Sequence, residues 1–203
     1  MKKLFCVLLT LVLVFSSFSC GKRNRDYDEY EVKTAAENLI RKSKTLNDIY
    51  WGAGIGYYED DNYANGYYYP ADPTALFNLG FETVDELKER TAKVFSKQYC
   101  DVIFEGNFIS EGEENQDIPK RYYQSFDCIM VYSKATVFLT DKVTYLYDTF
   151  EVVGSRKDTV FVTISVRVER GEASQERVIE IGLVEEDGEW RIDTPTYVSY
   201  RQE

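Results

Sequence analysis

The sequence predicts an α+β fold in which N-terminal helices pack on one face of a curved antiparallel sheet. Segments with helical periodicity occupy the first half of the chain, and segments rich in β-branched and aromatic residues occupy the second. Short turn signals separate these later segments, as in a meander of antiparallel strands. Helices and strands do not alternate, so we do not expect a doubly wound parallel sheet. The length suits one domain with short appendages, which we place at 30–203.

Two segments have the helical pattern. Residues 30–50 place apolar side chains at spacings of three and four, and a glycine-rich stretch follows them. Residues 83–99 begin with Thr83, a good N-cap residue, and Glu86 three positions later completes a capping box. We therefore expect two helices, with a short helical turn at 100–104 extending the second.

Six segments of the second half have the composition of strands. They are 126–132, 135–139, 143–153, 159–169, 177–185 and 190–193. In 159–169, valines and an isoleucine alternate with more polar residues, which predicts a strand with one buried and one largely solvated face. Asp187-Gly188, between two apolar runs, is the strongest hairpin signal in the chain.

The N-terminus has the order of an export signal. Lys2 and Lys3 precede an apolar run at 4–15, which is shorter than the ~20 residues of a transmembrane helix. The following Ser-Phe-Ser-Cys-Gly ends at Gly21 and resembles a bacterial lipobox. That resemblance implies cleavage before Cys20 and a thioether-linked diacylglyceryl anchor carrying palmitate-like chains. The alternative is an ordinary secreted protein with a chance cysteine.

The export signal sets the expected organisation and location. We expect a signal peptide at 1–19, a lipidated cysteine and tether at 20–29, and attachment to the outer face of the cell membrane or to the outer membrane. Loss of the two lysines of the signal would lower the formal net charge from −11 to −13. Nucleic acids are not expected as partners, because their binding needs a basic face.

Composition excludes several kinds of chemistry. The chain has no histidine, which removes Ser-His-Asp and Cys-His catalysis and every histidine-containing metal site. The glycines at 52–56 do not form a nucleotide-binding loop, since no strand precedes them and no Gly-Lys-Ser/Thr follows. The acidic and amide residues at 60–62 miss the spacing of an EF-hand loop. We therefore expect no cofactor and no metal.

The cysteines left after cleavage allow two interpretations. Cys6 would leave with the signal and Cys20 would be lipidated, so Cys100 and Cys128 remain as an even pair in an exported protein. They could form one disulfide that constrains the unfolded chain. The alternative is two separate thiols that behave as small apolar side chains.

Residues 57–69 are the most unusual segment, because tyrosines crowd among acidic and amide side chains. The tyrosines are Tyr57, Tyr58, Tyr63, Tyr67, Tyr68 and Tyr69. Tyrosine combines a large, stiff ring with a polar tip, the combination favoured in recognition surfaces. The segment is therefore a candidate binding surface for a protein or a glycan. The alternative is a loop that folds over an open end of the sheet and covers core residues with its rings.

Two short motifs resemble known families. The run Asp187-Gly188-Glu189-Trp190-Arg191-Ile192 resembles the closing hairpin of nuclear transport factor 2-like domains in exported bacterial proteins. Val94-Phe95-Ser96, followed by residues 99–104, resembles a segment of lipoproteins related to the DL-endopeptidase inhibitor (IseA) family. The first resemblance implies a cone-like sheet, and the second implies inhibition of a wall hydrolase. In such a sheet Trp190 would pack in the core or over the mouth, and Arg191 is a candidate ligand contact.

Two functional hypotheses follow. The first is a non-enzymatic, membrane-anchored module that binds a cell-envelope protein or a wall polymer, with wall-hydrolase inhibition as its specific form. The second is a small-molecule carrier or acid-base enzyme that uses the interior of the cone. For the second hypothesis the candidate polar groups are Asp127, Tyr145, Tyr147 and Asp148, although acidic residues on strands more often face water.

Overall fold

The computed structural model describes residues 27–60, 62, 64–109 and 119–198. Its α+β class is the predicted one, although the strands form two sheets rather than one. The helices in this part of the chain are α2 (Glu29–Trp51), α3 (Pro73–Leu79), α4 (Val84–Ala92) and α5 (Lys97–Asn107). The strands are β1 (Tyr68–Pro70), β2 (Tyr122–Ser125), β3 (Cys128–Tyr132), β4 (Lys142–Arg156), β5 (Thr159–Arg170), β6 (Ala173–Glu186) and β7 (Glu189–Ile192). They form two antiparallel sheets, β1-β3-β2 and β4-β5-β6-β7.

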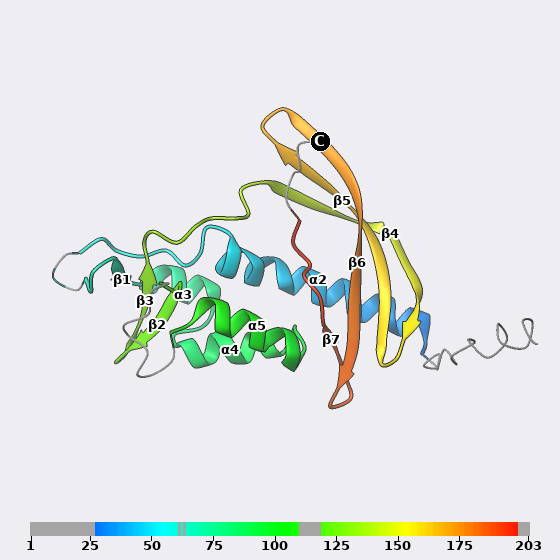
Figure 1. The fold of residues 1–203 in the computed structure, drawn as a ribbon, viewed down its shortest axis with the longest axis horizontal. Helices are drawn as coiled ribbons and strands as arrows, with labels where there is room; N and C mark the ends of the chain where they lie inside the picture. Colours follow the sequence, from blue (N-terminus) through cyan, green and yellow to red (C-terminus); the bar gives the residue numbers. More distant parts are fainter. Residues whose placement is uncertain (1–26, 61, 63, 110–118, 199–203) are drawn as a thin grey trace, which may run out of the picture.

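Helix α2 runs along the long direction of the molecule (Figure 1). Its 23 residues correspond to a length of about 34 Å. The carboxylate of Asp28 caps the first turn by accepting hydrogen bonds from the backbone N–H groups of Tyr30 and Glu31. The large sheet curves around α2, whereas the small sheet lies beyond its C-terminal end (Figure 1). The small sheet is therefore far from the point at which the chain enters α2.

The large sheet and α2 share one continuous hydrophobic core. On β5 the alternating residues from Val160 to Val168 have no exposed surface, which confirms the predicted period of two. Ala36 and Ile40 of α2 are equally buried and belong to the same cluster. The Asp187-Gly188 turn also forms as predicted, with φ of 53° and 80°, and it pairs β6 with β7.

The predicted helix at 83–99 is in fact two helices. Helix α4 ends at Ala92 because the next residues join the edge of the large sheet instead. The backbone of Ile192 donates to the carbonyl of Val94 over 2.9 Å and accepts from the N–H of Ser96 over 2.8 Å. Ser96 then starts α5 as its N-cap, and its hydroxyl accepts a hydrogen bond from the backbone of Tyr99.

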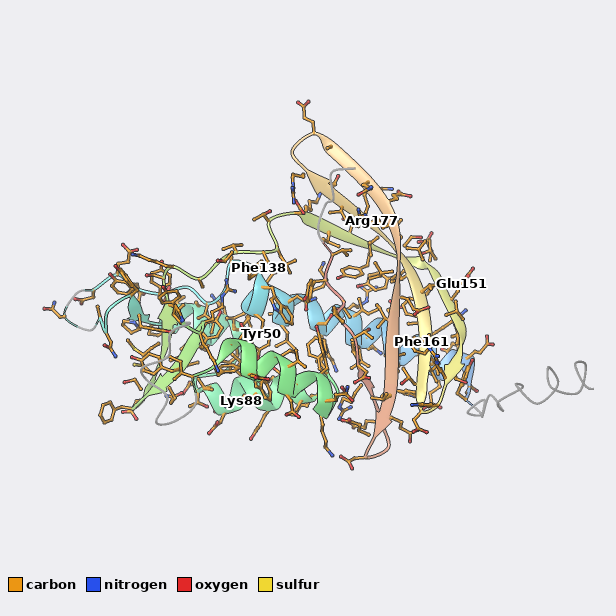
Figure 2. The ribbon with its side chains drawn as sticks, in the orientation of Figure 1. Tyr50, Lys88, Phe138, Glu151, Phe161 and Arg177 are labelled. Carbon is orange, nitrogen blue, oxygen red and sulfur yellow. The ribbon has the colours of Figure 1, made fainter. Side chains whose placement is uncertain are left out.

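The strand prediction needs corrections at the small sheet. Residues 135–139 are not a strand, because the N–H groups of Phe138 and Leu139 bond to the carbonyl of Trp51 at the end of α2. Phe138 is labelled on this connection in Figure 2. Residues 128–132 pair with two strands that were not predicted, β1 and β2, and so do not join the meander. Helix α3 was also missed, although Asp72-Pro73 and Gly80 are ordinary helix start and stop signals.

A buried arginine holds the small sheet against the end of α2. Arg121 is 7% exposed, and its guanidinium donates to the carbonyls of Ile49 over 2.8 Å and of Gly52 over 2.9 Å. The Tyr122 hydroxyl donates to the same Ile49 carbonyl over 2.6 Å. Gly54, at φ 83°, passes so close to both side chains that a Cβ there would lie 3.0 Å from the Tyr122 hydroxyl. Within the glycine-rich stretch after α2, Gly54 therefore permits this close approach.

Candidate functional site

The small sheet gathers tyrosines on one face. Tyr67 and Tyr68 come from the predicted segment, Tyr123 comes from β2, and Tyr132 comes from β3. Together with Asn65 they line an open depression of about 280 Å³, and Gly66, Ile109 and Pro119 complete its lining. We call the four tyrosines and Asn65 the tyrosine surface.

The rings of the tyrosine surface contact one another through edges and tilted faces. The ring centroid of Tyr68 lies 5.0 Å from that of Tyr123 and 5.1 Å from that of Tyr132. Tyr67 meets Tyr132 edge-on at 6.4 Å, and the ammonium group of Lys134 lies 3.3 Å from the Tyr67 ring centroid. Tyr67 remains 53% exposed. The surface thus combines a packed ring at its centre with an accessible ring at its rim.

Polar atoms surround these rings. The Asn65 amide donates to the Tyr123 hydroxyl over 3.1 Å, and the Tyr68 hydroxyl donates to the carbonyl of Lys120 over 2.6 Å. Burial raises the pKa of Tyr68 to about 12, so its hydroxyl stays protonated at neutral pH. Neutral hydroxyls and an amide can both donate and accept hydrogen bonds. The surface therefore offers aromatic ring faces with neutral polar groups beside them, together with the Lys134 ammonium over the Tyr67 ring.

A tight turn presents Tyr67 to the rim. The backbones of Asn65 and Tyr68 exchange two hydrogen bonds, of 3.0 and 3.1 Å, across Gly66 and Tyr67. Gly66 adopts φ 63°, which is the left-handed conformation that glycine tolerates best. Tyr68 then enters β1 and pairs with Tyr132 across the sheet.

The remaining predicted tyrosines lie elsewhere. Tyr69 alternates with Tyr68 along β1, so it points to the opposite face of the sheet, where it stacks on Tyr57 at 5.7 Å. Tyr57 packs against the core, as the alternative interpretation of this segment expects. Tyr58 is exposed, and a hydrogen bond with the Asp72 carboxylate raises its pKa. Tyr63 lies outside the described residues.

Sequence reasoning missed Tyr123 and Tyr132 as site residues. Both belong to strand-like sequence, and Tyr132 lies in a predicted strand, so strand composition alone gave no reason to select either of them. Their place in the site comes from the order β1-β3-β2, which pairs residues far apart in the chain. The Tyr122-Tyr123 pair before a turn was the available signal.

Arg191 lies away from the tyrosine surface, on β7. Its guanidinium donates to the carbonyls of Ala92 and Trp190 over 2.9 Å each, and to the Glu189 carboxylate over 2.6 Å. The side chain is only 14% exposed. Arg191 therefore joins β7 to the end of α4, and its place in the predicted binding surface is not supported. Trp190 is partly buried against the core, as expected.

Both described cysteines are free thiols, which matches the second interpretation of the pair. Cys100 is buried on α5 and donates to the carbonyl of Phe95. Burial raises the pKa of Cys100 to about 12, which keeps the thiol protonated and unreactive at neutral pH. Cys128 begins β3 and donates to the carbonyl of Ser125.

The polar groups considered for an enzyme do not converge. Asp127 and Asp148 are exposed. The buried Tyr145 hydroxyl donates to the carbonyl of Thr196 over 2.6 Å, and the Tyr147 ring lies 3.8 Å beneath the guanidinium of Arg41. Within the described ranges, no three acidic or cysteine side chains are grouped in a way that could hold a metal ion.

Comparison with protein-family models and with curated proteins leaves the chain without an assigned family. No protein-family model matches it, and no curated protein matches it significantly. The resemblances to nuclear transport factor 2-like and IseA-like domains thus rest on the two short motifs and remain predictions. Cys20 and the export signal lie outside the described residues. No helix among the described residues of 27–198 combines the length and the apolar character needed to cross a membrane.

Proposed function

We propose that this protein is an exported, lipid-anchored, non-enzymatic module that binds a wall polymer of the cell envelope through the tyrosine surface. The observation that carries the proposal is the grouping of Tyr67, Tyr68, Tyr123 and Tyr132 with Asn65 around an open depression of about 280 Å³. Aromatic faces carry partial negative charge and attract the C–H faces of sugar rings, while neutral hydroxyl and amide groups bond the sugar hydroxyls.

The arrangement of the elements supports the same proposal. The anchor proposed at Cys20 precedes α2, and the tyrosine surface lies at the other end of that helix, which is about 34 Å long (Figure 1). A tethered module arranged in this way would present its binding surface away from the lipid. The curved large sheet over α2 is compatible with a cone-like fold, which we retain as part of the proposal. The face of β5 that would line such a cone is filled with buried valines and an isoleucine, which gives a carrier or enzyme function little support.

Anchoring is tested by replacing the lipid-bearing residue. The C20S variant is expected to leave the membrane fraction and to lose incorporation of labelled palmitate, because serine cannot form the thioether. The measurement is fractionation of cells that express the parent or the variant. A C6S variant is the matched control and is expected to stay membrane-bound. A C20S chain that retains its label and its location would contradict the anchor.

Binding is tested by removing two groups from the rim of the tyrosine surface. The Y67A/N65A double variant is expected to bind purified peptidoglycan sacculi about tenfold more weakly than the parent in a sedimentation assay. Both side chains are exposed, so the fold is expected to survive. Y30A is the matched control, because Tyr30 is 81% exposed on α2 at the opposite end of the molecule.

Comparison of Y67A/N65A with Y30A shows whether the tyrosine surface is the binding site, and a pull-down shows whether the ligand is a protein. If Y67A/N65A retains the parent's affinity, or if Y30A loses as much, the tyrosine surface is not the wall-binding site. If sacculi do not bind but a pull-down through the same surface retains an envelope protein, the ligand is a protein and the wall-polymer proposal fails. Retention of a DL-endopeptidase in that pull-down would identify the inhibitory form of the module.

A further inference from the structure

A second recess lies between α2, α3 and α4. It has a volume of about 640 Å³, within the range of small-molecule sites. Its apolar lining consists of Leu46, Ile49, Leu79, Phe81 and Val94. We call it the helix groove. It is larger than the depression at the tyrosine surface.

The walls of the helix groove follow from helical periodicity. Lys42, Thr45, Leu46 and Ile49 stand at helical spacing on one side of α2, and residues 90, 93 and 94 form the corresponding row at the end of α4. A hydrogen bond of 2.7 Å between the hydroxyls of Tyr50 and Thr91 holds the two helices together, and Figure 2 labels Tyr50. The groove is therefore formed in advance of any ligand, which lowers the entropic cost of binding.

The charges around the groove have one sign. Its lining contains the cations Lys42, Arg90 and Lys93 and no acidic residue, in a protein with a formal net charge of −11. In the part of the chain that the structure describes, none of the three forms an ion pair. An acidic protein that leaves three cations around an apolar recess is expected to attract an anion there.

Arg90 is held in place by a hydrogen bond that uses only part of its hydrogen-bond donor capacity. Its guanidinium donates to the carbonyl of Leu79 at the end of α3. Gly80 permits this approach, since a Cβ there would lie 3.1 Å from the guanidinium, and φ at Gly80 is 74°. Guanidinium carries five N–H donors in a fixed fork, so donors remain for an anionic ligand.

We propose that the helix groove binds a single-chain fatty acid, with its hydrocarbon chain on the apolar floor and its carboxylate among Lys42, Arg90 and Lys93. An apolar floor beside three positive charges favours a ligand that has both an apolar body and an anionic head. Each buried methylene group adds to the affinity of such a ligand, and free inorganic anions have no methylene groups to bury. The inference concerns a site separate from the tyrosine surface and does not depend on the proposed function.

The test is an isothermal calorimetric titration of the full chain with laurate, kept below its critical micelle concentration. The parent is expected to bind one laurate at the groove, and K42Q/K93Q is expected to bind it about tenfold more weakly. The matched control is K33Q/K44Q, which also removes two positive charges from the chain but none from the groove. A T45W variant fills the groove without changing charge and is expected to abolish the same binding event. All variants carry the same N-terminus, so differences among them report on the groove.

Three results would overturn the proposal. The first is unchanged laurate affinity in K42Q/K93Q and T45W, with thermal unfolding by circular dichroism showing both to be folded. The second is equal binding of dodecanol and laurate, or of inorganic phosphate and laurate. Either result would mean that the groove does not recognise the carboxylate and the hydrocarbon chain together. The third is binding of a hexaglutamate peptide without binding of laurate, which would make the groove a peptide site.

Discussion

Replacing Arg121 with methionine is expected to lower the free energy of unfolding by about 3 kcal/mol or more. The guanidinium is buried and bonds to the carbonyls of Ile49 and Gly52, with a longer contact of 3.3 Å to that of Thr136. Hydrogen bonds that involve a charged group contribute roughly 1.5–3 kcal/mol each. Methionine would remove the Arg121 donor from all of these carbonyls, and only the Ile49 carbonyl would keep a bond from Tyr122. The positive charge also lies at the C-terminal end of α2, where the helix dipole favours a cation.

The measurement is urea unfolding followed by far-ultraviolet circular dichroism. R41M is the matched control, because Arg41 lies on the surface of α2, where it pairs with Glu37 at an exposed site and lies over the Tyr147 ring. Exposed pairs of this kind contribute about 0–1 kcal/mol, so R41M is expected to change stability little. If the two variants are equally stable, Arg121 does not hold the small sheet to α2.

The loss expected for R121M extends to the candidate site. Arg121 directly precedes β2, and the next residue, Tyr122, pairs with β3. The face that carries Tyr123 and Tyr132 is thus positioned by contacts to the end of α2. A partly stable R121M chain is therefore expected to lose wall binding as well, whereas R41M is expected to keep it.

Local patterns in the sequence predicted the parts of the fold that depend on local physics. The spacing along 30–50 predicted α2, and the alternation along 159–169 predicted β5, because one buried face imposes its period on each. The turn at Asp187-Gly188 was predictable for a different local reason, because its backbone conformation favours those two residues.

The errors arose where distant residues decide the structure. The helix predicted at 83–99 breaks because Ile192, about a hundred positions later, bonds to the backbone of Val94 and Ser96. Residues 135–139 have strand composition, yet their N–H groups bond to the end of α2. In both places a long-range hydrogen bond outweighs the local preference.

The candidate site was also predicted only as far as local sequence determines it. Composition identified Tyr67 and Tyr68, but it could not separate them from Tyr57 and Tyr69, which face the other way. That separation depends on the registers of β1 and β3. Arg121 gave no signal at all, because its partners are main-chain carbonyls about 70 residues earlier, and carbonyl groups have no sequence signature.

Replacing Thr196 with valine is expected to lower the free energy of unfolding by about 2–3 kcal/mol, although valine has nearly the same shape. Thr196 is fully buried and joins the C-terminal segment to α2. The Ser43 hydroxyl donates to the carbonyl of Ile40, so the 2.8 Å contact between Ser43 and Thr196 must use the Thr196 proton. The Asn47 amide donates to the Thr196 oxygen over 2.9 Å.

Valine removes both of these bonds at once. Oδ1 of Asn47 is already buried without a hydrogen-bond partner, so the T196V chain would leave both polar ends of this amide unpaired. Buried polar groups in that state cost more than the bond itself contributed. T196S keeps the hydroxyl and loses only a methyl group, so it is the control and is expected to stay closer to the parent in urea unfolding. A T196V chain as stable as T196S would mean that packing, rather than this hydrogen-bond network, holds the C-terminal segment against α2.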